Sequence, residues 1–252
     1  MPELPDLSNP RYLDEIGYFL SYEKHYWREG EYPEARISYS LSLLEEVLRH
    51  CKKDEEWLRQ ASVASIGCGC SGDLIAWPAR TKIGIDPLLY AYQKLGMIGK
   101  DVEGTNTTIY LSVSAQEVPL LDECIDLAVC RNVLDHVPDP LKVVNEVSRI
   151  LKAEGGLFVG VDIGGEPTPD EPNPYQNEES VRSLLEKEFE ILSFARKDDP
   201  YSVNRDYSLR IVARRKPRPV EQWDKERILG AYEAQFDQQL QDAEETTRQK
   251  AR

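Results

Sequence analysis

Short apolar runs alternate with amphipathic stretches through the middle of the chain. Five runs of strand length occupy residues 62–66, 82–85, 108–111, 125–129 and 156–161. Between the last two runs, Leu141, Val144 and Val147 recur at three-residue spacing, which predicts a helix over 141–151. Near-continuous apolar strands separated by helices are typical of a parallel sheet covered on both faces. The pattern therefore predicts an α/β domain with a doubly wound sheet.

The pattern changes after the fifth run. Residues 180–188 are predicted to be a helix, with Ser180 as its N-cap. Residues 189–194 and 209–213 are apolar enough to be strands, and no helical pattern separates them. We therefore expect them to pair in antiparallel fashion at the sheet edge, which gives seven strands with the last one antiparallel.

The two ends of the chain differ from this middle part. Apolar residues at helical spacing predict a helix over 34–52. We divide the chain into an aromatic-rich helical segment (1–33), the α/β domain (34–216) and a polar helix or tail (217–252). The aromatic segment suits either packing against the sheet edge or a lid. The tail has a thin apolar stripe, which suits a peripheral helix or a homodimer contact.

Charge and composition exclude several partners. The 252 residues carry a formal net charge of −14, and such a surface repels phosphate backbones, so no nucleic acid is expected. No apolar run approaches the length needed to span a bilayer, and the acidic, proline-bearing start is unlike a secretory signal. We expect a cytoplasmic protein without membrane contact. Cys68 and Cys70 have no partners at zinc-site spacing, so no metal is expected.

A glycine-rich turn gives the sharpest functional signal. Gly67, Gly69 and Gly72 follow the first apolar run in a G-x-G-x-x-G spacing, which lets the backbone approach a ligand closely. Asp86 ends the next run, 19 residues after Gly67, where a carboxylate can accept bonds from both ribose hydroxyls of a nucleoside. On these residues alone, NAD and S-adenosylmethionine fit almost equally well.

Further motifs carry a resemblance to a known family. The segments 65–69 (SIGCG), 84–88 (GIDPL), 114–120 (SAQEVPL), 125–137 (IDLAVCRNVLDHV) and 144–156 occur in order. Together they resemble class I S-adenosylmethionine-dependent methyltransferases over residues 35–215. The resemblance implies a seven-stranded sheet, S-adenosylmethionine as cofactor and S-adenosylhomocysteine as product.

The resemblance also implies roles for individual residues. Near the methionine part of the cofactor it places the backbone of Gly67, Cys68 and Gly69, together with Arg131 and Asn132. It assigns the ribose to Asp86. Around the adenine it places Pro87, Leu88, Ser114, Ala115 and Gln116.

Three positions depart from the family pattern. Ser65 stands where the family often has an acid, so one contact toward the methionine end is expected to be lost or bridged by water. Ser114 stands where the family often has Asp, so adenine recognition is expected to depend on a hydroxyl or a backbone amide. Pro78 interrupts the stretch after Gly72, so the first crossover helix is expected to span only about two turns.

His136 and Asp135 are the candidate catalytic residues. They follow the fourth strand on the side where ligands bind in such sheets, and His136 suits a general base or a substrate ligand. Packing at the start of the next helix is an equal alternative. Asp162, at the end of the fifth strand, is a second candidate, or it caps the following loop.

We expect methyl transfer to a small-molecule acceptor at an oxygen or nitrogen atom, such as a glycan or a secondary-metabolite intermediate. The loop at 163–177, with four prolines, suggests a shaped pocket for it. Two alternatives stay open: a non-catalytic protein that binds the cofactor or a partner, and an NAD-dependent reductase.

Overall fold

The computed structural model describes residues 32–70, 72–168, 171–198 and 205–217. Its helices are α2 (Tyr32–Cys51), α3 (Glu55–Leu58), α4 (Leu89–Lys94), α5 (Pro140–Ile150) and α6 (Glu178–Leu185). Its strands are β1 (Ser62–Ile66), β2 (Thr81–Ile85), β3 (Thr108–Leu111), β4 (Ile125–Arg131), β5 (Leu151–Ile163), β6 (Phe189–Lys197) and β7 (Tyr207–Arg215).

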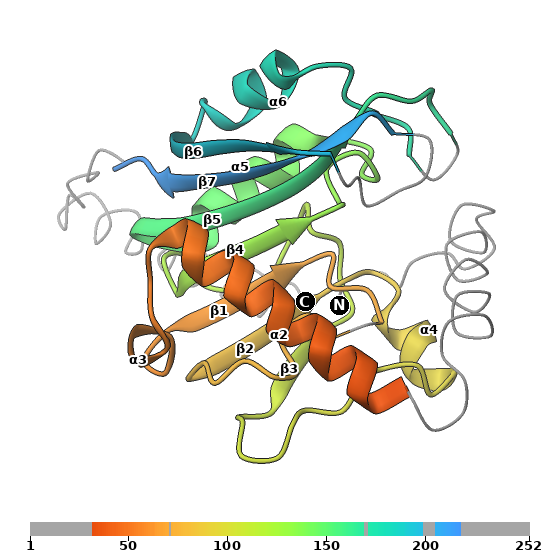
Figure 1. Ribbon diagram of the computed structural model, residues 1–252, viewed down its shortest axis with the longest axis vertical. Helices are drawn as coiled ribbons and strands as arrows, with labels where there is room; N and C mark the ends of the chain where they lie inside the picture. Colours follow the sequence, from red (N-terminus) through yellow and green to blue (C-terminus); the bar gives the residue numbers. More distant parts are fainter. Residues whose placement is uncertain (1–31, 71, 169–170, 199–204, 218–252) are drawn as a thin grey trace, which may run out of the picture. The chain divides into compact units, whose positions relative to one another are not determined.

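These strands form one seven-stranded sheet in the order β3-β2-β1-β4-β5-β7-β6 (Figure 1). The strands β1 to β5 pair in parallel, whereas β7 runs antiparallel to both β5 and β6. The predicted doubly wound sheet with an antiparallel last strand is thus confirmed. Because the chain reverses direction in sheet order at β1 and β4, ligands are expected at the carboxyl ends of these two strands.

Alternate side chains of each central strand enter two different cores. Ala128 and Cys130 of β4 pack with α5 and α6 on one face of the sheet. Leu127 and Val129 pack with α2 on the other face. Burial on both faces explains why the strands read as continuous apolar runs. Helix α5 begins sharply because Pro140 occupies its first turn and Asp139 caps it.

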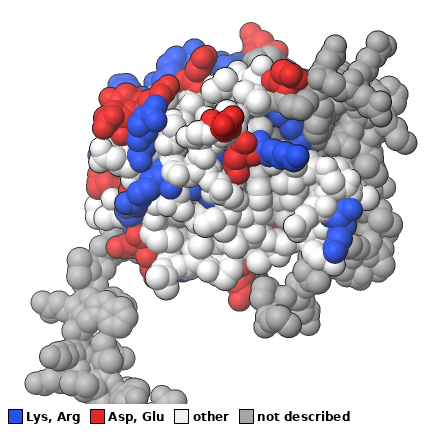
Figure 2. All heavy atoms as spheres, turned by 90° about the horizontal axis from the view of Figure 1, so that it is seen from below, with Lys and Arg blue, Asp and Glu red and all other residues white. Residues whose placement is uncertain are grey.

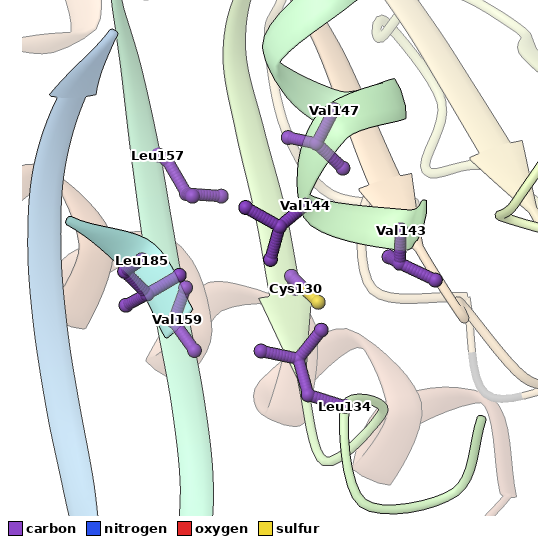
Figure 3. Close-up of a pocket in the computed structure, with 8 residues that line it drawn as sticks. All are labelled: Cys130, Leu134, Val143, Val144, Val147, Leu157, Val159 and Leu185. Atoms are coloured by element: carbon purple, nitrogen blue, oxygen red, sulfur yellow. The ribbon is translucent and has the colours of Figure 1, made fainter. Parts of the chain in front are cut away.

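A small cavity remains in the first of these cores (Figure 3). It has a volume of about 10 Å³ and lies among apolar side chains of β4, β5, α5 and α6. Its lining is Cys130, Leu134, Val143, Val144, Val147, Leu157, Val159 and Leu185. An apolar space of this size stays dry and cannot hold a cofactor.

Two local predictions are wrong. Among the described residues between β1 and β2, which leave out residue 71, no helix forms where two turns were expected. Turns with bonds three residues apart occur instead, such as Trp77 N–H to the Leu74 carbonyl. Pro78 ends this segment, and the Ala76 N–H donates to the Ser40 hydroxyl of α2 rather than along a helix. Helix α6 is capped by Asn177, three residues before Ser180, because its side chain accepts the Ser180 N–H.

The proposed lid and homodimer helix lie in the predicted end segments, outside the described residues except for 32–33 and 217. Within the described ranges, no helix combines the length and apolarity that crossing a membrane requires.

A buried ion pair fixes the start of β2. Lys82 has no exposed side-chain surface, and its Nζ donates to Asp101 Oδ1 at 2.6 Å and to Thr105 Oγ1 at 3.1 Å. Burial lowers the pKa of Lys82, and the bond to Asp101 opposes this shift. The carboxylate also accepts the Thr108 N–H of β3, so one group holds two neighbouring strands.

Removing one partner of this pair should therefore destabilise the fold. We expect Asp101→Asn to lower the free energy of unfolding by about 3 kcal/mol, because it leaves a buried ammonium without its counter-charge. Urea denaturation measures the loss. The double variant Lys82→Met/Asp101→Asn should recover part of the lost free energy of unfolding. A double variant that is less stable than Asp101→Asn alone would contradict this explanation.

Candidate functional site

The fold brings most predicted site residues to one edge of the sheet. The glycine turn follows β1, Asp86 follows β2, and Arg131 ends β4. Both β2 and β4 are hydrogen-bonded neighbours of β1, in parallel register. Their carboxyl ends therefore lie side by side, at the position where nucleotide cofactors bind in open α/β sheets.

The glycine turn is held in place by β2. The backbone N–H groups of Gly67 and Cys68 both donate to the Ile85 carbonyl, at 2.7 and 3.1 Å. Gly67 has a φ of +63°, and a Cβ atom there would collide with the Val133 side chain. Glycine at this position is thus required by the packing of the protein itself.

Asp86 joins the two loops that begin at β1 and β2. Its carboxylate accepts the Gly69 N–H at 3.0 Å and the Leu88 N–H at 2.8 Å, and the residue is 4% exposed. Burial raises the pKa of the Asp86 carboxyl to about 6, against the lowering effect of these two bonds. Each oxygen keeps acceptor capacity beyond its single backbone bond.

A second buried carboxylate, Asp73, was given no role in the sequence analysis. It accepts the Ser65 hydroxyl at 2.7 Å and the Tyr39 hydroxyl at 3.2 Å, and Arg131 Nη2 lies 3.9 Å away. Burial raises the pKa of Asp73 to about 6. Its position directly after Gly72 was the available signal. The structure shows that an acid lies against Ser65 although the strand itself lacks one.

Helix α2 attaches to the glycine turn at several points. Arg36 donates to the Cys70 carbonyl at 2.8 Å, and the Ser40 hydroxyl donates to the Asp73 carbonyl at 2.7 Å. The Arg131 guanidinium lies 4.6 Å from the Tyr39 ring centroid, a cation–π distance. Helix α2 therefore holds the loop in addition to the bonds that it makes with β2.

The residues predicted around the adenine are only partly accessible. Leu88 is fully buried in a small core cluster, and Ala115 is 6% exposed. Ser114 is exposed, and its hydroxyl accepts the Gln116 N–H at 3.2 Å. Pro87 is held by the Ser112 hydroxyl, which donates to its carbonyl at 3.1 Å.

An open cleft of about 310 Å³ lies beside these residues. It is formed by α4 and the end of β3, and it is lined by Leu89, Tyr90, Gln93, Ile98, Tyr110 and Ser112. Five of these side chains, all except Ile98, lie one to five residues from the predicted Leu88 or Ser114, at positions that the motif did not point to.

Asp135 and His136 lie beyond the end of β4. Asp135 is 1% exposed, and its Oδ1 is 4.0 Å from His136 Nε2. Burial raises the pKa of Asp135 to about 7; the charge of Asp162 adds to this shift, and that of Arg205 opposes it. Asn132 adopts a φ of +54°, and its Nδ2 lies 3.2 Å from His136 Nε2.

The proline-rich loop brings a further carboxylate to this point. Glu171 Oε1 is 3.7 Å from His136 Nε2, and Glu171 is 7% exposed. The loop is fastened by Asn173, whose N–H donates to the Asp135 carbonyl and whose Nδ2 donates to the Val137 carbonyl. Sequence spacing gave no signal for Glu171, because only the folded loop places it beside His136.

Charges of both signs are mixed on the face that Figure 2 shows. Lys and Arg side chains there lie among Asp and Glu side chains and around a broad uncharged area. In this view, the described residues form no continuous basic surface.

Comparisons with known proteins indicate the family and the fold. Residues 64–159 match the family model described as a methyltransferase domain. Over 102 residues the chain is 31% identical to the ubiquinone biosynthesis O-methyltransferase of Actinobacillus pleuropneumoniae and 33% identical to that of Pseudomonas entomophila. These alignments cover 38% of this chain and 43% and 42% of the relatives, so it spans less than half the length of the curated relatives it matches.

Solved structures show the same fold at lower sequence identity. A methyltransferase from Methanosarcina mazei, described as SAM-dependent, has a TM-score of 0.52 and 19% identity, over 64% of this chain and 94% of that one. The 1,6-didemethyltoxoflavin-N1-methyltransferase of Burkholderia thailandensis, solved with S-adenosylhomocysteine bound, has a TM-score of 0.51 and 17% identity, over 85% and 93%. Motifs, sheet order and family match together identify the chain as carrying a class I S-adenosylmethionine-dependent methyltransferase domain.

Proposed function

We propose that this protein transfers the methyl group of S-adenosylmethionine to an oxygen or nitrogen atom of a small molecule. The buried Asp86 carboxylate beside the glycine turn carries this proposal, because it presents spare acceptor capacity where a ribose would lie. In the reaction, a lone pair of the acceptor attacks the methyl carbon in line. The C–S electron pair returns to sulfur, and the acceptor releases its proton.

At the cofactor end, the backbone of Gly67, Cys68 and Gly69 would pass beneath the methionine part. Asp73 is the group that we assign to the ammonium of this part, in place of the acid that Ser65 lacks; their 2.7 Å bond supports this role. Arg131, 3.9 Å from Asp73, suits the methionine carboxylate. Asn132 lies beside it at the end of β4.

Around the adenine, Pro87, Leu88, Ser114, Ala115 and Gln116 remain the proposed contacts. The burial of Leu88 and Ala115 favours backbone contacts for these two. The cleft beside α4 supports a wider adenine site that includes Tyr90 and Tyr110.

At the acceptor end, His136 and Asp135 are the residues that we propose to act on the acceptor. They lie past the end of β4, beneath the loop that follows β5. The names of the similar proteins, an O-methyltransferase of ubiquinone biosynthesis and an N-methyltransferase of a small heterocycle, favour a ring-bearing acceptor.

Replacing Asp86 should weaken cofactor binding. We expect Asp86→Ala to bind S-adenosylhomocysteine roughly tenfold to a hundredfold more weakly, because hydrogen bonds to a charged group contribute about 1.5–3 kcal/mol. Titration calorimetry with S-adenosylmethionine, S-adenosylhomocysteine and NAD measures the change. Asp126→Ala is a matched control, since Asp126 also accepts a backbone N–H, that of Ser62, but at the opposite end of the strands. Unchanged affinity in Asp86→Ala, or tight NAD binding alone in the wild type, would refute the assignment.

Affinity should also depend on pH. Burial raises the pKa of Asp86 and Asp73 to about 6, and only their ionised forms serve the ribose hydroxyls and the ammonium fully. The cofactor-free protein therefore loses stability as pH rises from about 4 to 6, while cofactor affinity increases over that range. We expect the dissociation constant of S-adenosylhomocysteine at pH 5 to be at least about tenfold above its value at pH 7. Calorimetry from pH 5 to 8 tests this, and a flat profile would contradict it.

Moving the carboxylate tests the role of Asp73. We expect Asp73→Asn to weaken S-adenosylhomocysteine binding about tenfold, since a charge-assisted bond to the ammonium is lost. Binding of 5′-methylthioadenosine, which lacks the amino-acid part, should stay unchanged and serves as the internal control. Ser65→Asp/Asp73→Ser should restore much of the affinity. Equal losses for both ligands would instead indicate a purely structural role.

A further inference from the structure

Three side chains that can bind a metal ion converge at the proposed acceptor site. Asp135 and His136 come from the segment after β4, and Glu171 comes from the loop after β5. One ligand atom from each lies within 4.8 Å of the others. The distances from His136 Nε2 are 4.0 Å to Asp135 Oδ1 and 3.7 Å to Glu171 Oε1.

The Asp135 carboxylate supplies an independent observation. Its side chain is 2% exposed, and its Oδ1 atom has no hydrogen-bond partner among the described residues. A buried carboxylate oxygen without a donor is costly, so native proteins pair such a group or place it on a metal ion. This oxygen faces His136 and the Glu171 side, where the third ligand stands.

We propose that Asp135, His136 and Glu171 bind a divalent transition-metal cation. Metal–ligand bonds of about 2.0–2.2 Å place pairs of ligand atoms roughly 3–4.4 Å apart, a range that includes both measured separations. Two carboxylates with one imidazole suit a cation such as Mn²⁺ or Zn²⁺. Three protein ligands leave positions open for a small molecule.

The neighbouring groups fit this assignment. Arg205 pairs with Glu171 through Oε2, whereas Oε1 faces His136, so the arginine can orient the carboxylate without occupying the ligand atom. Arg205 is also fixed by its bond to the Gly164 carbonyl at 2.8 Å. The charge of Asp162 acts on Asp135 and offsets that of Arg205.

Asn132 offers a fourth ligand. Its Nδ2 faces His136 Nε2 at 3.2 Å, while its buried Oδ1 has no hydrogen-bond partner in the described part of the chain. Turning the amide by 180° exchanges the two atoms, so that the oxygen points toward the ligand cluster and the imidazole nitrogen is released for the cation.

This inference rests on the proposed methyl transfer and narrows its acceptor. A cation at this point would bind a hydroxyl of the acceptor and lower its pKa, so that the oxygen attacks the methyl carbon as an anion and its proton goes to solvent. The acceptor class is then a phenol or an ortho-dihydroxy ring. His136 acts here as a ligand rather than as a free base. The expectation of no metal considered only cysteine spacing, which says nothing about oxygen ligands 36 residues apart.

Metal binding is tested on the full-length chain with Mn²⁺ alone, without donor or acceptor. We expect one Mn²⁺ per chain, seen as loss of the free-ion signal in electron paramagnetic resonance, and a rise in Tm when Mn²⁺ is added. Asp135→Asn and Glu171→Gln should each weaken this binding at least about tenfold. Asp135→Asn should nevertheless fold with an unreduced Tm in the absence of metal, because it removes a buried charge of which one oxygen has no hydrogen-bond donor among the described residues. Glu190→Gln is the matched control, since Glu190 pairs with Arg214 at the surface.

The outcomes separate this site from the methyl-donor site. Zn²⁺ binding that is lost in the same variants also supports the proposal. No binding of either ion, or binding retained in both site variants, overturns it. Affinity for S-adenosylhomocysteine should be unchanged in Glu171→Gln. A wild-type protein that binds Mn²⁺ but not S-adenosylhomocysteine would refute the proposed methyl transfer and leave the metal site in place.

Discussion

The architecture of the site depends on one buried carboxylate. Asp86 accepts backbone N–H groups from both the turn after β1 and the turn after β2, so it fixes the distance between these two loops. Among the described hydrogen bonds, no other side chain accepts backbone N–H groups from both loops. Burial makes the ionised form costly, and the backbone donors recover part of that cost. A ligand that adds hydroxyl donors would recover more, which links cofactor binding to the order of both loops.

The two halves of the site are built differently. At the proposed cofactor site, the backbone of the glycine turn is held by the Ile85 carbonyl of β2 and by the Arg36 and Ser40 side chains of α2. At the proposed acceptor site, the side chains of Asp135, His136 and Glu171 lie together, and Asn173 fastens the loop after β5 to the segment after β4. A turn held by two elements suits the proposed binding of a cofactor common to many proteins, whereas a loop suits the proposed acceptor site, because residues that differ between proteins are often on loops.

The sheet was predictable from the sequence because burial on both faces leaves a clear apolar run for each strand. Competition between hydrogen-bond partners could not be predicted from the sequence. The Ser40 hydroxyl of α2 accepts the Ala76 N–H, and Asn177 rather than Ser180 caps α6. The position of Asp86 beside the glycine turn could be predicted because it follows from the order of the strands along the chain. Glu171 and the partnership of Asp73 with Ser65 follow from loop geometry, which no spacing in the chain encodes.

The contact between the glycine turn and Val133 has an evolutionary consequence. Since any larger residue at 67 would clash inside the folded chain, selection for folding alone preserves Gly67. A descendant that had given up catalysis would keep this glycine unchanged. In such a lineage, loss of activity would first be visible at positions whose side chains contact only the ligand. Gly67 is therefore a marker of the fold and not of catalytic activity.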